Sequence, residues 1–266
     1  MSQLETIRQQ CKLLRLPSIA EAVPEAITLA GQQEWSLESF LLYLLEQETA
    51  GRQQRRIERL LREAHLPLDK TLARFEQSRL PLRLRRQLPS LIQGDFINQA
   101  DNILIFGQPG TGKTHLAAAL AYEWIQRDYS VWFTPTYKLI DGLLRAKRDY
   151  DLERELKRLD RFEVVILDDI GYVQQSREEM EVLFTFLAER YERKSVVITS
   201  NLVFSQWDQI FKDPLTTAAA IDRVVHHSRI IEFGSDMTSV RAEEAARRQL
   251  QEVGQDPPAQ VAANQS

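Results

Sequence analysis

Residues 107–114 read GQPGTGKT and stand between an apolar run at 103–106 and a helical pattern at 114–129. Glycines in such a loop let backbone N–H groups turn inward around phosphate oxygens, at a helix N-terminus that already favours anions. The motif is a complete Walker A pattern, in which Lys113 reaches the β- and γ-phosphates of ATP and Thr114 binds Mg²⁺. It predicts a nucleotide site formed by Gly107, Gln108, Pro109, Gly110, Thr111, Gly112, Lys113, Thr114 and His115.

A second motif lies at 164–169, where VVILDD is an apolar run that ends in two carboxylates. Alone, this pattern fits a surface turn equally well, but behind a Walker A motif it indicates a Walker B strand. Two acids at such a strand end place one at the magnesium ion and one beside the attacking water. We therefore assign Asp168 to the metal and Asp169 to the water. Many such ATPases carry Glu at the second position, so the shorter Asp169 is compatible with slow hydrolysis.

A third polar strand end follows at 195–201, which reads SVVITSN. The central strand of a P-loop sheet presents its end to the γ-phosphate, so Asn201 is the candidate to orient the attacking water. The competing interpretation is a turn or helix-capping residue, because Asn is common in both. Thr199 and Ser200 are weaker alternatives for the same role.

The pattern of apolar residues changes along the chain. Residues 1–66 show helical spacing, which predicts a small helical N-terminal domain. Residues 67–94 hold prolines and many arginines and are interpreted as a basic connector. From 95 to 241, short apolar runs at 103–106, 131–134, 164–167, 196–199 and 230–233 alternate with helical patterns, which predicts an α/β AAA+ domain with a parallel five-stranded sheet. Residues 242–266 lack an apolar period, and we expect a disordered tail.

Composition narrows the setting of the protein. The single cysteine, Cys11, has no Cys or His partner at zinc spacing, and no segment has the apolar length of a signal peptide or membrane span. We therefore expect a cytoplasmic protein without a membrane partner. The net charge is −4, yet residues 50–86 hold eleven Lys or Arg against four Asp or Glu. Such charge runs are either solvated faces or phosphate-binding surfaces. The candidate clusters are Arg52–Arg62, Arg79–Arg86, and the group Lys138, Arg145, Lys147 and Arg148.

The motifs together resemble a known family. DDIGY, SREEMEVLF, LAERYERKSVVITSN, WDQIF and AAIDRVVHHS at 168–228, with LESFLLYLLEQETAGRQQRRIERLLREAHLP near the N-terminus, are similar to the IstB-like transposition helper ATPases. These belong to the same AAA+ clade as helicase loaders of the DnaC type. The resemblance covers nearly the whole chain. It implies a protein encoded beside a transposase, which binds duplex DNA as an ATP-dependent homo-oligomer and stimulates the cognate transposase.

The resemblance also suggests roles for single residues. Arg223 in AIDRVVHH matches the arginine finger that completes the site of a neighbouring subunit, and Arg241 matches a weaker sensor position, although Val240 replaces the usual aromatic residue. The basic cluster at 138–148 falls where the loader clade inserts a helix that lines the nucleic-acid channel. Independently of the family, Phe96 and Ile97 lie just before the first strand and are candidates for the adenine walls, with core packing as the competing interpretation.

Two functions from different classes remain open at this point. The first is a DNA-binding AAA+ regulator of a transposase, assembled by ATP on duplex DNA. The second is a DnaC-like helicase loader, which grips a helicase through its N-terminal domain and single-stranded DNA through its ring. A plain nucleotide-binding protein without a DNA role is disfavoured by the basic clusters. The N-terminal helices favour the first function because they resemble those of the transposition helpers.

Overall fold

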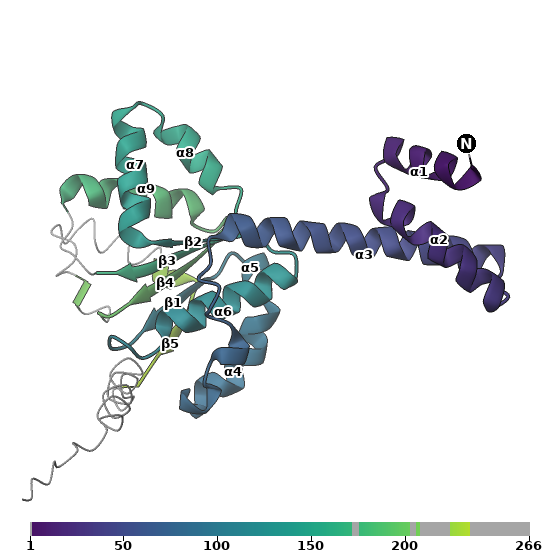
Figure 1. Cartoon of the computed structure of the whole chain (residues 1–266). Helices are drawn as coiled ribbons and strands as arrows, with labels where there is room; N and C mark the ends of the chain where they lie inside the picture. Colours follow the sequence, from purple (N-terminus) through teal and green to yellow (C-terminus); the bar gives the residue numbers. More distant parts are fainter. Residues whose placement is uncertain (1, 172–175, 203–205, 208–223, 235–266) are drawn as a thin grey trace, which may run out of the picture. The chain divides into compact units, whose positions relative to one another are not determined.

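A computed structural model of the chain describes residues 2–171, 176–202, 206–207 and 224–234 (Figure 1). Packing divides the backbone into two compact units, Met1–Glu63 and Ala64–Ser266, and each is described by itself. Within the described residues, no helix has both the length and the apolar character that a membrane span requires.

The first unit is helical, as its apolar spacing predicts. It consists of α1 (Gln3–Leu13), α2 (Pro17–Gln32) and most of α3 (Leu37–Ala64). Pro17 stands in the first turn of α2, where its fixed φ suits the helix and its missing N–H costs nothing. The helices bury a small apolar core, formed by Cys11, Ile19, Val23, Ala26 and Leu44.

One buried carboxylate ties α3 to the start of α2. Glu48 accepts hydrogen bonds from the backbone N–H groups of Ser18 (2.9 Å) and Ile19 (3.3 Å). It also pairs with Arg52 (2.9 Å) and Arg55 (3.2 Å). Burial alone would raise the pKa of Glu48, but the hydrogen bonds from Arg52 and the α2 backbone outweigh it and lower that pKa. Two arginines of the Arg52–Arg62 stripe are therefore engaged in the fold of this unit.

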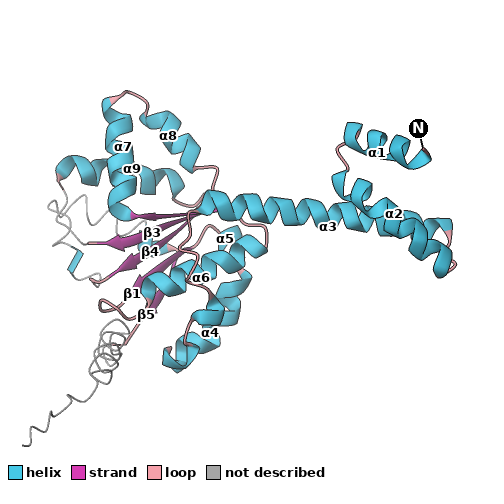
Figure 2. Ribbon diagram, viewed as in Figure 1, coloured by secondary structure: helices cyan, strands magenta, loops and turns pink. Residues whose placement is uncertain are grey.

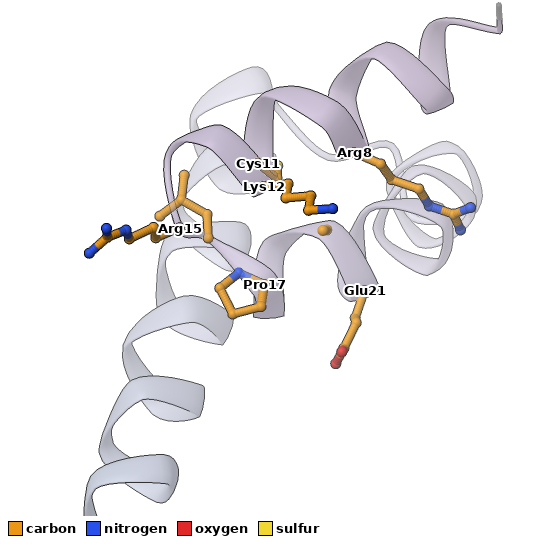
Figure 3. Close-up of a pocket in the computed structure, with 8 residues that line it drawn as sticks. Arg8, Cys11, Lys12, Arg15, Pro17 and Glu21 are labelled. Atoms are coloured by element: carbon orange, nitrogen blue, oxygen red, sulfur yellow. The ribbon is translucent and has the colours of Figure 1, made fainter.

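A pocket of about 570 Å³ lies beside α1 and the start of α2 in the same unit. The buried Cys11 and several charged residues are among those that line it (Figure 3). The charged residues are Arg8, Lys12, Arg15 and Glu21.

The second unit is built on a five-stranded sheet in which every strand pair is parallel. The strands are β1 (Asn102–Phe106), β2 (Val131–Pro135), β3 (Val164–Ile170), β4 (Ser195–Ser200) and β5 (Ser228–Glu232). Their order across the sheet is β2-β3-β4-β1-β5 (Figure 2). The prediction of an α/β fold with five parallel strands is confirmed. This order places the carboxyl end of β4 between those of β1 and β3.

Helices cover both faces of the sheet (Figure 1). On one side α6 (Lys113–Gln126) packs on the strands, and Trp124 and Ile125 are fully buried there. On the other, α7 (Thr136–Arg148), α8 (Leu152–Leu159) and α9 (Arg177–Arg190) share one apolar core with the sheet. A capping box formed by Ser176 and Glu179 opens α9.

Residues 67–94 differ from the plain connector expected from the sequence. They form the short 3₁₀ turns η1 (Leu72–Arg74) and η2 (Gln77–Arg79) and then α4 (Leu82–Gln93), which is followed by α5 (Asp95–Asn98). The arginines of α4 lie in its first half, while Leu84, Leu88 and Leu91 recur at helical spacing and are buried. Trp124 of α6 donates a 2.7 Å hydrogen bond to the carbonyl of Leu91. The second half of the segment is thus part of the α/β unit.

Candidate nucleotide site

The glycine-rich loop lies between β1 and α6, as the Walker A motif predicts. Gly112 caps α6 with a φ of 101°, a left-handed conformation that side chains rarely adopt. At Gly107 the constraint is space, because a Cβ atom there would lie 2.7 Å from the Cβ of Phe233. The buried Lys113 donates hydrogen bonds to the carbonyls of Gly107 (2.8 Å) and Gln108 (2.9 Å). The backbone therefore fixes the ammonium group within the loop.

Asp168 stands at the carboxyl end of β3 and faces the first turn of α6. Its Oδ1 accepts hydrogen bonds from the hydroxyls of Thr114 (2.9 Å) and Thr199 (2.7 Å). A carboxylate and two hydroxyl oxygens at one point are ligands of the kind that Mg²⁺ prefers. The residues present thus fit the cation that the Walker motifs imply.

Asp169 interrupts the regular pairing of β3 with β4. It has a φ of 62°, and the register shifts between Leu167 and Ile170. Irregularities of this kind occur beside active sites, where they re-aim a side chain. Its backbone N–H donates to the Thr199 hydroxyl (2.8 Å), and its Oδ1 accepts from the amide of Asn201 (3.0 Å).

Asn201 follows the central strand β4, and its side chain connects Lys113 of the glycine-rich loop with Asp169 of β3. Its Oδ1 accepts a 2.6 Å hydrogen bond from Lys113, while its amide nitrogen contacts Asp169. The side chain lies in the site, as a water-orienting residue requires. The neighbouring Ser200 instead donates to the carbonyls of Ile170 and Leu202, away from these groups.

Three further residues belong to this neighbourhood. Thr199, considered from sequence only as a weak alternative to Asn201, contacts both aspartates. Thr136 at the start of α7 donates to the carbonyl of Asp168 (3.0 Å), and Phe75 lies 3.4 Å from the position of a Cβ at Gly112. Phe75 also meets the ring of His115 edge-on at 5.1 Å. No sequence signal marked Phe75, because it falls in the presumed connector.

Other predicted residues are placed differently. Phe96 is fully buried against Trp124, with ring centroids 5.1 Å apart, and Ile97 is also buried. Both therefore pack in the core, and their contact with adenine stays a prediction. The proposed arginine finger Arg223 and sensor Arg241 lie outside the described residues.

The predicted DNA cluster lies on α7, which begins at the nucleotide site. Lys138, Arg145 and Arg148 are exposed. Lys147 instead forms a 2.8 Å ion pair with Glu181 of α9. The structure therefore separates one member of the cluster from the other three.

Taken together, the site combines an ammonium group, two carboxylates and an amide at the carboxyl ends of three adjacent strands. The ammonium and the loop N–H groups suit phosphate oxygens, and the first carboxylate suits a divalent cation. The second carboxylate and the amide are arranged to polarise and orient a water molecule. This chemistry is that of nucleoside triphosphate binding and hydrolysis.

Comparison with known proteins agrees with this chemistry. The IstB-like ATP binding protein family matches residues 9–246. An ATP-binding protein assigned to an insertion sequence of Sinorhizobium fredii is 41% identical over 236 residues, which cover 88% of this chain and 79% of that protein. The ATP-binding protein assigned to insertion sequence IS21 of Pseudomonas aeruginosa is 37% identical over 228 residues, with coverages of 86% and 85%.

Solved structures share the fold. The structure of DnaI aligns with a TM-score of 0.54 at 21% identity, over 64% of this chain and 95% of that chain. Aquifex aeolicus DnaA bound to AMPPCP aligns with a TM-score of 0.52 at 20% identity, over 71% and 56%. These likenesses support the α/β P-loop architecture of AAA+ proteins. With the family match over most of its length, the chain belongs to the IstB-like ATP-binding proteins.

Proposed function

We propose that this protein is a Mg²⁺-dependent ATPase that assembles as an oligomer on duplex DNA and stimulates a partner transposase. The observation that carries the proposal is the start of α7, where Thr136 donates a hydrogen bond to the backbone of Asp168. This contact links the basic helix directly to the Walker B strand. A change in the nucleotide bound near Asp168 can therefore alter the position of α7, which carries the surface that meets DNA. The insertion-sequence assignment of the relatives supports the transposase as partner.

Each residue of the site has a separate role in ATP hydrolysis. Thr114 and Asp168 would hold Mg²⁺, which neutralises phosphate charge when bound. Lys113 stabilises the β- and γ-phosphates, Asp169 accepts a proton from the attacking water, and Asn201 orients that water. Arg223 from a neighbouring copy supplies the remaining positive charge.

The DNA surface is the exposed face of α7. Lys138, Arg145 and Arg148 are seven and three residues apart, a spacing that places them on one side of a helix. Asp141 shares this side and lowers its net charge. Lys147 points to another side, where Glu181 pairs with it. Contacts from the three exposed cations would be to phosphates, dependent on salt and independent of base sequence.

Fluorescence anisotropy of a labelled duplex, measured at several salt concentrations with a slowly hydrolysed ATP analogue, tests this surface. Replacing Lys138, Arg145 and Arg148 by Ala should weaken binding and reduce the slope of log affinity against log salt by about three units. The matched control replaces Arg59 and Arg62, two exposed arginines of α3, and should change the slope less. If the control loses affinity and the α7 variant keeps it, the helical unit binds DNA instead. A strong preference for single-stranded DNA would favour the helicase-loader alternative.

Assembly is tested by mixing two inactive variants. Arg223→Ala lacks the finger and Lys113→Ala lacks the phosphate contact, so a mixed oligomer contains some complete sites. ATP turnover should therefore recover partly at intermediate mixing ratios. Turnover that never exceeds the sum of the two separate variants would contradict a site shared between subunits.

A further inference from the structure

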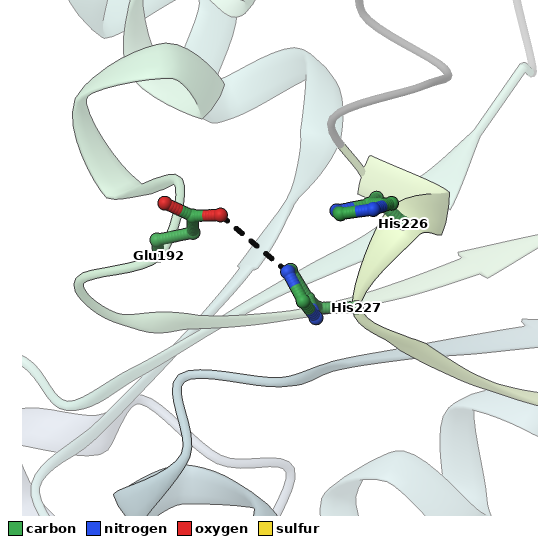
Figure 4. A group of neighbouring side chains, drawn as sticks. All are labelled: Glu192, His226 and His227. Atoms are coloured by element: carbon green, nitrogen blue, oxygen red, sulfur yellow. Dashed lines mark ion pairs between the residues drawn. The ribbon is translucent and has the colours of Figure 1, made fainter.

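A second group of side chains lies at the opposite end of the sheet from the nucleotide site. Glu192 is in the turn before β4, His226 is the last of the helical residues 224–226, and His227 is in the turn that leads into β5. Within the described part of the chain, this is a group whose ligand atoms could hold a metal ion, because they all lie within 4.8 Å of one another. Figure 4 shows the Glu192 carboxylate directed toward His227, with His226 on the adjacent turn.

The distances suit a tetrahedral ion. The Nε2 atom of His227 lies 3.4 Å from Oε1 of Glu192. Ligand atoms about 2.0–2.2 Å from a tetrahedral zinc ion are separated by roughly 3.3–3.6 Å. The pair therefore needs little movement to become two corners of the coordination shell. From the present limit of 4.8 Å, the ligand atom of His226 must approach by at most about 1.5 Å.

The backbone around the two histidines is held in place. The carbonyl of His227 accepts a 2.6 Å hydrogen bond from the N–H of Asn102, and the Asn102 amide donates to the carbonyl of Val224 (3.2 Å). The Asn102 oxygen in turn accepts from the N–H of Val196 in β4 (2.9 Å). One buried side chain thus joins the histidine segment to the strand that follows Glu192. Because the backbone is already held in place, binding an ion costs less conformational entropy.

A second hydrogen bond orients His226. Its Nδ1 lies 3.3 Å from the Tyr191 hydroxyl, which leaves Nε2 for a metal ion. Metal-binding histidines commonly have their other ring nitrogen engaged in this way, which fixes ring orientation. The chemistry of the donors also restricts the ion, because two imidazoles and one carboxylate are typical of zinc with one open position.

We propose that Glu192, His226 and His227 form a zinc site whose fourth ligand is water or a donor from another molecule. The ion joins the turn before β4 to the segment before β5, two parts of the chain 34 residues apart. Arg223 directly precedes Val224 in the sequence, so zinc restrains the chain beside the proposed arginine finger. That consequence rests on the proposed function, whereas zinc binding itself does not.

Isothermal titration of the full, untagged chain with Zn²⁺ tests the site. Excess Mg²⁺ is included so that carboxylates of the nucleotide site are not counted. One equivalent should bind, and Glu192→Gln, His226→Gln and His227→Gln should each weaken binding by at least about tenfold. His65→Gln is the matched control, because His65 is also exposed and lies outside the group, and it should bind as the native chain does.

Cobalt substitution gives an independent readout. Tetrahedral Co²⁺ with nitrogen and oxygen ligands absorbs much more strongly in the visible range than octahedral Co²⁺. The native chain should give the strong spectrum, and the three site variants should not. Unchanged Zn²⁺ affinity in these variants, or no binding at micromolar Zn²⁺, would overturn the proposal. Neither readout uses ATP or DNA, so failure here is distinct from failure of the proposed function.

Discussion

The N-termini of α2 and α6 use the same physics in different ways. Both helices begin with free N–H groups and the positive end of the helix dipole. In α2 the chain supplies the negative charge, because the Glu48 carboxylate accepts from Ser18 and Ile19. In α6 the first residue is Lys113, and its ammonium group adds positive charge beside the loop N–H groups.

This difference indicates that the charge at α2 contributes to folding and the charge at α6 contributes to ligand binding. At α2 the anion belongs to α3, so its free energy contributes to folding of the helical unit. At α6 an anion must come from a ligand, and the phosphates of ATP are that anion in this family. Removing a charge from the first site should therefore change stability, and removing one from the second should change binding. Lys113→Ala and Glu48→Gln test this distinction, and Asp169→Asn and Thr199→Val separate binding from turnover within the nucleotide site.

The largest effect is expected for Lys113→Ala. The substitution removes a cation with several charge-assisted hydrogen bonds, so ATP affinity should fall on the order of 1,000-fold. Isothermal titration measures it, with Glu48→Gln as the contrasting variant that should bind ATP normally. If Glu48→Gln lost as much ATP affinity as Lys113→Ala, the N-terminus of α2 would also contribute to ATP binding, which would contradict this distinction.

Asp169→Asn should preserve binding and reduce turnover. The amide keeps the shape of the side chain but cannot accept a proton from water, so hydrolysis should slow by about 100-fold. Phosphate release at saturating ATP measures turnover, and nucleotide titration measures binding. Undiminished release would move the role of base to another residue.

Glu48→Gln should destabilise the helical unit by about 2 kcal/mol, because two arginines and two backbone N–H groups lose an anionic partner. Chemical denaturation followed by circular dichroism measures this change. Glu46→Gln is the matched control, since Glu46 is an exposed glutamate on the same helix. A stability loss of the same size in the control would contradict a special role for Glu48.

The same variant predicts a pH dependence. The pKa of Glu48 is lowered in the folded protein from its ordinary 4.5. Its stabilising contribution is therefore fully present above pH 4.5 and is lost as pH falls through the lower native pKa. The stability difference between the native chain and Glu48→Gln should shrink over that acidic range. A difference that stays constant into acid would show that charge is not the cause.

The sequence predicts the elements of the site better than their contacts. Apolar runs and a glycine-rich loop are local patterns, so the five strands and the positions of Lys113 and Asp168 follow from them. The contact of Thr199 with both aspartates depends on the register of β3 against β4 and on its shift between Leu167 and Ile170. No local pattern specifies that shift. Phe75 approaches Gly112 through tertiary packing, which leaves no periodic signal either.

Arg52 and Arg55 show the same limitation on the surface. Their spacing along α3 is that of a solvated basic face, and the sequence alone cannot distinguish it from a DNA-binding stripe. The distinction comes from Glu48, a residue of the same helix, whose burial depends on the packing of α2. Charge in sequence therefore indicates where cations are, and packing decides which are free to bind phosphate.

The smallest effect is expected for Thr199→Val, which keeps the shape of a buried strand residue and removes its hydroxyl. Asp168 then loses a 2.7 Å donor, and the N–H of Asp169 loses its acceptor at 2.8 Å. Each loss corresponds to about 1 kcal/mol, so turnover should fall roughly tenfold as the two carboxylates lose their alignment. ATP affinity should change little, because Lys113 and the loop are untouched.

The matched control for this change is Thr134→Val. Thr134 is also a buried threonine near the carboxyl end of a strand, but its hydroxyl contacts only the carbonyl of Pro135 among the bonds described for it. The Thr134→Val variant should lose about as much stability as Thr199→Val and keep its turnover. If both variants lose turnover equally, the effect comes from general weakening of the sheet. If only Thr199→Val does, the hydroxyl between the two aspartates aligns them for hydrolysis.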